Sequence, residues 1–128
     1  MIFGTGIDTI EVERIRQSID KYGEQFIQRI YSEEEIAYCN WRYHSVEHFA
    51  ARFAAKEAFS KALGTGWRRG FIWKEVSVRN QRTGQPFLYL YPTMAERAQK
   101  LIGQDFRIHI SLTHTKTMAE AIAMIETI

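Results

Sequence analysis

The sequence predicts an α+β fold in which helices pack on an antiparallel sheet. Three observations lead to this prediction: an alternating strand-like segment over residues 1–10, one long alanine-rich helix over 46–63, and further strands separated by turns in the second half. The chain has 128 residues, of which 45% are hydrophobic and 25% are charged. These values are typical of a globular protein, and we expect a single domain over residues 1–128.

The first segment places Gly4, Gly6 and Asp8 on one face of the predicted strand, because side chains alternate with a period of two. Asp8 lies near the end of the strand. Its same-face neighbours are glycines, so we expect room around the carboxylate for a bulky group. Helix N-capping or turn formation is the alternative role for this aspartate.

Three short helices are predicted next. Residues 11–21 have an amphipathic pattern, Tyr22-Gly23 interrupts it, and a short helix is expected over 24–30. Ser32 is followed three residues later by Glu35, which is the form of a capping box, so a helix should begin there and reach about Asn40.

The long helix should end at Gly64, a residue suited to a left-handed helix terminus. A turn around Arg82-Thr83-Gly84 separates two of the strands that follow. The remaining elements are strands at about 72–79, 87–91, 106–113 and 118–126 and a helix at about 93–102. Only the last strand is ambiguous, because its alternating alanines suit a helix equally well.

Membrane association and disulfide chemistry are not expected. No apolar run approaches the roughly 18 residues needed to span a bilayer, and the first residues lack the pattern of a signal peptide, so we expect a cytoplasmic protein. The single cysteine, Cys39, has no partner for an internal disulfide and is interpreted as a small buried hydrophobic residue.

Positive charge is concentrated in the middle of the chain. Between residues 41 and 74 there are seven Lys or Arg and two acids, a balance of +5, although the net charge of the whole chain is only +2. Such a segment is typical of a protein that binds a phosphate-bearing molecule or an acidic macromolecule. A solvated helix face is the other interpretation, and charge alone leaves both open.

Glu57 and Lys61 are four residues apart in the long helix and therefore project from the same side. An exposed stabilising pair has this spacing. Here, however, Ala50, Ala54 and Ala58 form a small-residue stripe near Glu57, where another backbone or a ligand could approach. Asp8 and Glu57 together would supply the one or two carboxylates that Mg²⁺ commonly takes from a protein, with Lys61 beside the bound phosphates.

Four histidines offer weaker signals. In the strand predicted over 106–113, His109 and His114 differ in parity, so they form a poor chelating pair. His114, at the strand end, is the better candidate for donating to a phosphate, and His109 is interpreted as structural. His44 and His48 have a chelating spacing but no third ligand patterned beside them.

Several motifs together resemble one known family. They are Gly6-Ile7-Asp8 with the following Arg14, the segment from Arg52 to Gly66 that contains Lys-Glu-Ala-Phe-Ser-Lys-Ala, Gly84-Gln85-Pro86, and Ser111 to Thr115. In this order and spacing they resemble the holo-[acyl-carrier-protein] synthases, the small bacterial family of the 4′-phosphopantetheinyl transferase superfamily. The resemblance runs from residue 4 to residue 126. The segment 67–73 is bulkier than the family pattern.

The resemblance implies an enzyme that transfers the 4′-phosphopantetheine group of coenzyme A to a serine of apo acyl carrier protein and releases adenosine 3′,5′-bisphosphate, in support of fatty acid biosynthesis. It implies a catalytic group of Asp8, Glu57 and Lys61, in which the two acids are ligands of Mg²⁺. Arg14 matches a contact for the acidic helix of the carrier protein. The implied coenzyme A contacts are Arg52, Lys61, Gly64, Thr65, Gly66, Pro86, His114 and Thr115.

The same resemblance implies a 4′-phosphopantetheinyl transferase fold that assembles as a homotrimer, with active sites in the clefts between subunits. The general base is left open between a metal-bound water and a carboxylate near the serine.

Two rival functions remain. A metal-dependent nuclease is disfavoured because its Glu and Lys are commonly two apart on a strand, whereas Glu57 and Lys61 are four apart in a helix. A non-catalytic module that binds nucleic acid or an acidic protein would use the basic segment and its aromatic residues. These aromatics are Trp41, Tyr43, Trp67 and Trp73. With the transferase interpretation we expect no nucleic-acid partner.

Overall fold

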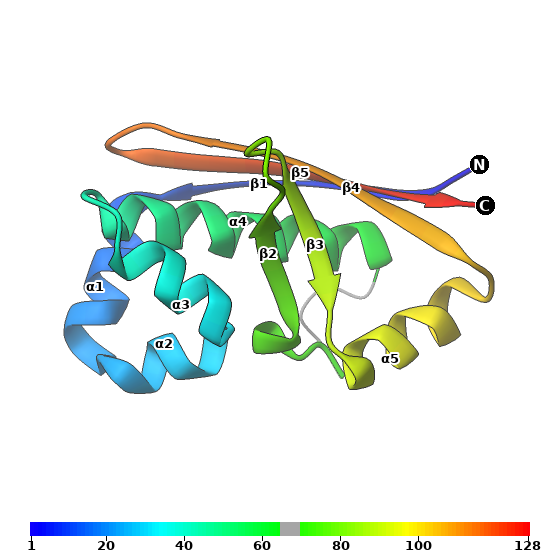
Figure 1. The fold of residues 1–128 in the computed structure, drawn as a ribbon, viewed down its shortest axis with the longest axis horizontal. Coiled ribbons are helices and arrows are strands. Elements are labelled where there is room, and N and C mark those ends of the chain that lie inside the picture. The colour runs from blue at the N-terminus through cyan, green and yellow to red at the C-terminus, as the bar shows by residue number, and fades with distance from the viewer. Residues whose placement is uncertain (65–69) are drawn as a thin grey trace.

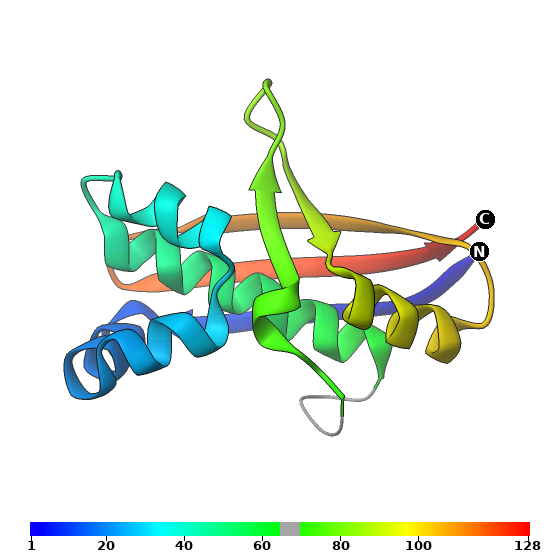
Figure 2. The ribbon, with the colours of Figure 1, turned by 60° about the horizontal axis from the view of Figure 1, so that its bottom comes forward.

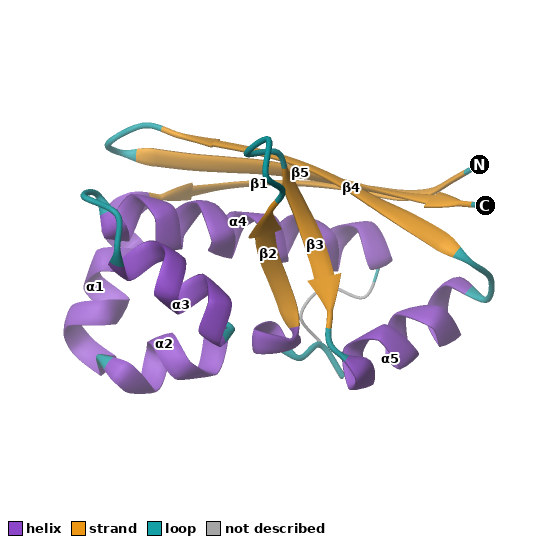
Figure 3. Cartoon of the chain, in the orientation of Figure 1, coloured by secondary structure: helices purple, strands orange, loops and turns teal. Residues whose placement is uncertain are grey.

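The computed structural model describes residues 1–64 and 70–128 and has the predicted α+β architecture (Figures 1 and 3). Its strands form two antiparallel sheets. The larger sheet has the order β1-β5-β4, and the smaller one pairs β2 with β3. The strands are β1 (Ile2–Glu11), β2 (Val76–Asn80), β3 (Pro86–Leu90), β4 (Phe106–His114) and β5 (Met118–Thr127). The helices are α1 (Val12–Tyr22), α2 (Glu24–Ile30), α3 (Glu33–Asn40), α4 (Ser45–Leu63) and α5 (Pro92–Ile102).

Helix α4 lies along one face of the larger sheet (Figure 1). Helices α1 to α3 gather near the N-terminal end of α4, and α5 lies at the opposite end of the molecule. In the second view the β2–β3 hairpin crosses α4 and its turn projects outward (Figure 2). The chain termini lie together, since the backbone N–H of Thr127 donates to the carbonyl of Met1.

Most predicted elements are confirmed, with two differences. The segment expected to be a strand over 72–79 begins as a 3₁₀ turn, η1 (Trp73–Glu75), and only then becomes β2. The predicted antiparallel strands also divide between two sheets instead of forming one. The capping box is present, because the Ser32 hydroxyl accepts from the Glu35 N–H while the Glu35 carboxylate accepts from the Ser32 N–H.

The ambiguous C-terminal segment is a strand. In β5 the odd-numbered residues from Ala119 to Ile125 are buried, and residues between them, including Glu120 and Ile122, are exposed. A period of two is the pattern of a strand covered on one face only. Pairing with β1 on one side and β4 on the other fixes this register.

The glycines of β1 have a different role from the predicted one. A Cβ atom on Gly4 would lie 2.1 Å from the carbonyl oxygen of Ala62, and one on Gly6 would lie 1.9 Å from that of Ala58. The space above the glycines is therefore occupied by the backbone of α4, which corrects the expectation that it accommodates a bulky group. Close approach of α4 instead brings its side chains next to the end of β1.

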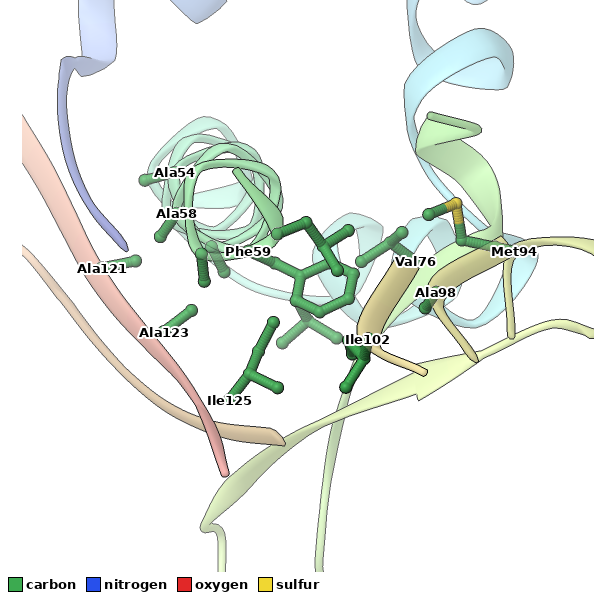
Figure 4. Packing of buried hydrophobic residues seen from close by; sticks show 14 residues of the cluster. Ala54, Ala58, Phe59, Val76, Met94, Ala98, Ile102, Ala121, Ala123 and Ile125 are labelled. Carbon is green, nitrogen blue, oxygen red and sulfur yellow. The ribbon is translucent and has the colours of Figure 1, made fainter. Parts of the chain in front are cut away.

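The main core lies between α4, the larger sheet, β2 and α5. Figure 4 shows Phe59 of α4 within it, with Ala123 and Ile125 of β5 toward one side and Val76 and Ile102 toward the other. Burial of one such large apolar side chain contributes about 1.5–3 kcal/mol. A second cluster joins α1, α2 and α3 to the N-terminal half of α4. Both cores therefore hold α4 in place.

The sheet face opposite α4 carries exposed apolar side chains. Phe3 is 40% exposed, Ile7 64% and Ile122 43%, and Ile7 lies directly opposite Ile122 in the pairing of β1 with β5. No helix among residues 1–64 and 70–128 is long and apolar enough to cross a membrane.

Candidate active site

Asp8, Glu57 and Lys61 meet where β1 runs over α4. The Lys61 ammonium donates to the carbonyl of Ile7 at 2.9 Å and to Asp8 Oδ1 at 3.2 Å. Glu57 lies one helical turn before Lys61, is 7% exposed, and is close enough to Asp8 for the charge of Asp8 to raise its pKa. The sequence-predicted group is thus brought together by the close contact between β1 and α4.

The two carboxylates are held in an environment that disfavours their charge. Burial raises the pKa of Glu57 to about 6, and the neighbouring charge of Asp8 acts in the same direction. Burial also raises the pKa of Asp8, although the hydrogen bond and charge of Lys61 oppose the shift. One lysine therefore does not fully offset two desolvated acids, and an additional cation would relieve their repulsion.

A cleft of about 500 Å³ opens beside this group between β1, α1, α2 and α4. Asp8 and Glu57 lie in its wall, and Arg14 and Lys21 contribute cations from α1. Phe26 and Phe53 are among the apolar side chains that line it. The structure thus places Arg14 on the same cleft as the carboxylates.

The donor set fits a hard divalent cation better than a transition metal. Within the described part of the chain, no three His, Cys, Asp or Glu side chains gather closely enough to hold a metal by themselves. Mg²⁺ commonly takes only one or two protein carboxylates and fills its other positions with water and phosphate oxygens. Asp8 and Glu57, close together and poorly neutralised, meet that requirement.

A second group lies toward the N-terminal end of α4. Arg52 is 2% exposed, stacks its guanidinium 4.0 Å from the ring centre of Tyr38, and donates to Asn80 Oδ1 at 3.1 Å. Arg42 lies at the same distance from the same ring. Two arginines on one tyrosine make a local concentration of positive charge within the basic segment 41–74, and no sequence pattern indicated that they share the Tyr38 ring.

His114 joins this second group from the end of β4. Its ring lies 4.9 Å from that of His48, and its Nδ1 lies 3.3 Å from Glu47 Oε1. The other Glu47 oxygen lies 3.2 Å from His44 Nδ1. His109 instead projects from the opposite face of the sheet and contacts Glu126 at 3.0 Å, so the predicted separation of His109 from His114 is confirmed.

The remaining predicted coenzyme A residues are spread over three loops. Gly64 ends α4 in the left-handed conformation, as expected, with φ of 83°. Pro86 begins β3 after the hairpin turn, and the Thr115 hydroxyl accepts from the N–H groups of Thr117 and Met118 in the β4–β5 turn. Thr65 and Gly66 lie outside the described residues.

The aromatics assigned to the nucleic-acid alternative do not form one surface. Trp73 stacks on Phe53 with ring centres 5.1 Å apart, whereas Trp41 is 86% exposed and Tyr43 is 96% exposed in the loop before α4. Trp67 lies outside the described residues. The described part of the chain therefore offers no row of stacking rings.

Sequence reasoning missed the buried pair of Lys56 and Glu35. Both side chains are fully buried, and Lys56 Nζ lies 2.7 Å from Glu35 Oε1. A lysine within the apolar run around Phe53 and Phe59 was the available signal, because a buried ammonium needs a partner. The aromatic lining of the cleft was missed because Phe26 and Phe53 have the spacing of ordinary core residues.

Comparison with known proteins finds a consistent set of relatives. The family model described as the 4′-phosphopantetheinyl transferase superfamily matches residues 4–123. The holo-[acyl-carrier-protein] synthase of Solibacter usitatus is 48% identical over 126 residues, covering 98% of this chain and 99% of the relative. That of Koribacter versatilis is 47% identical over the same shares.

Solved structures agree. The holo-[acyl-carrier-protein] synthase of Neisseria meningitidis superposes with a TM-score of 0.90 at 30% identity, covering 99% of this chain and 100% of that one. The enzyme of the same name from Bacillus anthracis, in complex with CoA (3′,5′-ADP), superposes with a TM-score of 0.81 at 35% identity, covering 100% and 99%. The whole described fold, and not only the motif region, is shared with these proteins.

Proposed function

The chain belongs to the 4′-phosphopantetheinyl transferase superfamily, and from this membership we propose that it acts as a holo-[acyl-carrier-protein] synthase. It transfers the 4′-phosphopantetheine group of coenzyme A to a serine hydroxyl of apo acyl carrier protein and releases adenosine 3′,5′-bisphosphate. The observation that carries this proposal is the group of Asp8, Glu57 and Lys61 at the cleft, where two poorly neutralised carboxylates lie beside a lysine.

The reaction requires charge neutralisation more than covalent help. The serine oxygen attacks the phosphorus that bears the pantetheine arm, the bond to the departing bisphosphate breaks, and the serine proton is released. Lys61, anchored on the Ile7 carbonyl, has an exposed ammonium that offers a positive charge to a phosphate oxygen. Asp8 and Glu57 would hold Mg²⁺, which when bound supplies further positive charge to the diphosphate. The cleft walls orient the two substrates.

Carrier recognition is assigned to helix α1. Arg14 and Lys21 are seven residues apart on α1 and both line the cleft. An acidic helix laid along this rim would bring its serine toward Asp8 and Glu57. Complementary charge of this kind acts mainly through encounter and orientation.

A homotrimer with active sites between subunits completes the proposal. The supporting feature is the sheet face opposite α4, where Phe3, Ile7 and Ile122 expose apolar surface that a subunit interface would bury. Substitution of Ile122 by Glu should yield a monomer in sedimentation analysis and reduce transfer. A wild-type protein that sediments as a monomer at micromolar concentration would overturn this part. We also propose that the enzyme is cytoplasmic.

One assay tests the proposed function. The purified protein, coenzyme A, Mg²⁺ and an apo acyl carrier protein are incubated, and the carrier is weighed by intact-mass spectrometry. The carrier should become heavier by one phosphopantetheine group, and a chelator should prevent the change. An unchanged carrier mass with correctly folded proteins and Mg²⁺ present would overturn the proposal.

A further inference from the structure

Two buried cations lie one turn apart on α4, and the fold satisfies only one of them. Lys56 is fully buried, pairs with Glu35, and donates to the carbonyls of Trp73 and Val76. Arg52 is almost as deeply buried, yet its Nε atom has no hydrogen-bond partner among the described residues. A buried cation without an acidic partner costs stability. We therefore expect Arg52, unlike Lys56, to have a role other than stabilising the fold.

The direct contacts of Arg52 among the described residues include neutral groups and no carboxylate. No Asp or Glu of residues 1–64 and 70–128 pairs with its guanidinium. Its neighbours include Arg42 on the shared Tyr38 ring and His48, whose carbonyl accepts from Nη1 at 3.4 Å. Glu47, five residues before Arg52 on the same helix, is already in contact with two histidines. This pattern indicates a site for an anionic ligand.

Asn80, the last residue of β2, provides the side-chain hydrogen-bond acceptor that orients Arg52. Its Oδ1 accepts from Arg52 Nη2 at 3.1 Å, and its Nδ2 donates to the carbonyl of Gly84 at 2.9 Å. The reverse orientation of the amide would set NH₂ against a guanidinium and oxygen against a carbonyl, so both contacts fix the amide one way round. Asn80 therefore links the buried arginine to the turn that precedes Pro86.

We propose that Asn80 is a positioning residue that gives Arg52 a neutral acceptor, so that the buried guanidinium keeps its charge for a phosphate group of coenzyme A. The inference rests on the proposed function. An aspartate at this position would also accept from Arg52, but it would form an ion pair that neutralises the cation and would repel an incoming phosphate. Asparagine orients without neutralising, which neither aspartate nor alanine can do.

Three variants separate this role from simple support of the hairpin. Asn80→Asp keeps an acceptor for Arg52, Asn80→Ala loses both hydrogen bonds, and Gln81→Glu adds the same charge on the next, exposed residue of the turn. Coenzyme A dissociation constants are measured by calorimetry, together with thermal midpoints and the Michaelis constant for the carrier.

We expect Asn80→Asp to weaken coenzyme A binding by at least about tenfold, because its carboxylate neutralises Arg52 and repels the phosphate. Asn80→Ala should weaken binding by about threefold, because Arg52 keeps its charge but loses the side chain that orients it. Gln81→Glu should change it by less than about twofold. The thermal midpoint, in contrast, should fall more for Asn80→Ala than for Asn80→Asp. The carrier Michaelis constant should stay constant.

The outcomes distinguish the positioning role of Asn80 from the proposed function. Coenzyme A affinity that follows stability, with Asn80→Ala weaker than Asn80→Asp, would overturn the positioning role while leaving the proposed function intact. An effect of Gln81→Glu equal to that of Asn80→Asp would do the same, since general charge would then explain the loss. A wild-type protein that binds no coenzyme A would overturn both.

Discussion

Lys56 and Glu57 are adjacent on α4, yet they belong to opposite kinds of polar site. Lys56 faces inward, where Glu35 and two backbone carbonyls satisfy its ammonium, and Glu35 in turn accepts from the N–H groups of Ser32 and Val78. Glu57 faces the cleft, where the charges that act on its pKa, among the described residues, are those of Asp8 and the half-exposed Lys61. The inward group, Lys56 with Glu35, is complete without a ligand. The outward group, Glu57 with Asp8 and Lys61, is not.

Structural and functional charges on one helix are therefore distinguished by whether the fold satisfies them. Satisfied buried charges fix the relative positions of α3, α4 and β2, and they should matter for stability. Unsatisfied charges at a cleft are maintained at the expense of stability and should matter for activity. If substitution of Lys56 changed activity alone, or substitution of Glu57 changed stability alone, this distinction would be wrong.

The largest effect is expected from Lys56→Ala. It leaves the Glu35 carboxylate buried without its cation, and loss of one partner of such a pair commonly costs about 3–5 kcal/mol. Urea denaturation at neutral pH measures the change, and a double variant with Glu35→Gln and Lys56→Met should recover part of it. A single-variant loss below about 1 kcal/mol would show that the inward group is dispensable.

Asp8→Asn should lower activity and not stability, the reverse of what we expect for Lys56→Ala. Initial transfer rates at saturating Mg²⁺ should fall by about 10²–10³, a loss typical of removing one electrostatic group from a reacting centre. The free energy of unfolding should remain near the wild-type value or rise, because the substitution relieves repulsion with Glu57. If the rate were unchanged and stability fell instead, Asp8 would belong with the inward group.

Lys61→Ala should lower the transfer rate by about tenfold or more, since the ammonium would no longer be available to a phosphate. As an ordinary helix-surface pair with Glu57, it would contribute only about 0.2–0.5 kcal/mol of stability and nothing to the rate. Rate and melting measurements on the same preparation separate these cases. A change in melting alone would support the surface-pair role.

The raised pKa of Glu57 predicts a pH effect on stability. Because the folded protein binds this proton more tightly than the unfolded chain, the stabilisation present below the usual pKa of 4.5 is lost as the pH rises through about 6. Metal-free melts between pH 4.5 and 7 should show this decline, and Glu57→Gln should reduce it. A variant with the same slope as wild type would assign the effect to other groups.

Arg14→Glu is expected to have the smallest effect, confined to one substrate. The Michaelis constant for the carrier should rise several-fold at low salt, and coenzyme A affinity should not change. The reason is that a charge at the rim of the cleft acts mainly on the encounter between the carrier and the enzyme. Arg16→Glu is the matched control, since Arg16 pairs with Glu13 at 3.3 Å and does not line the Asp8 cleft. Equal effects of the two variants would remove the assignment of Arg14 to the carrier.

The sequence predicted what depends on local pattern. The period of two in β1, the capping box at Ser32 and the four-residue spacing of Glu57 and Lys61 are readable because neighbouring residues determine them. It did not reveal that Gly4 and Gly6 contact the α4 backbone, because small residues fit a ligand and a close helix equally well.

Contacts between residues far apart in the sequence also could not be predicted. Asn80 and Arg52 are 28 residues apart, and Glu35 and Lys56 are 21 apart, so no short motif joins them. The division of the strands into two sheets also depends on where the β2–β3 hairpin crosses α4, which periodicity does not encode. Only the folded arrangement shows which buried charge is satisfied.

The most direct test of the outward group is the intact mass of an apo acyl carrier protein after incubation with coenzyme A, Mg²⁺ and either the wild-type enzyme or Glu57→Gln at equal folded concentration. We expect a mass gain of one phosphopantetheine with the wild type and almost none with Glu57→Gln over the same interval. Equal gain with both proteins would contradict the claim that the unsatisfied carboxylates of α4 and β1 form the reacting centre.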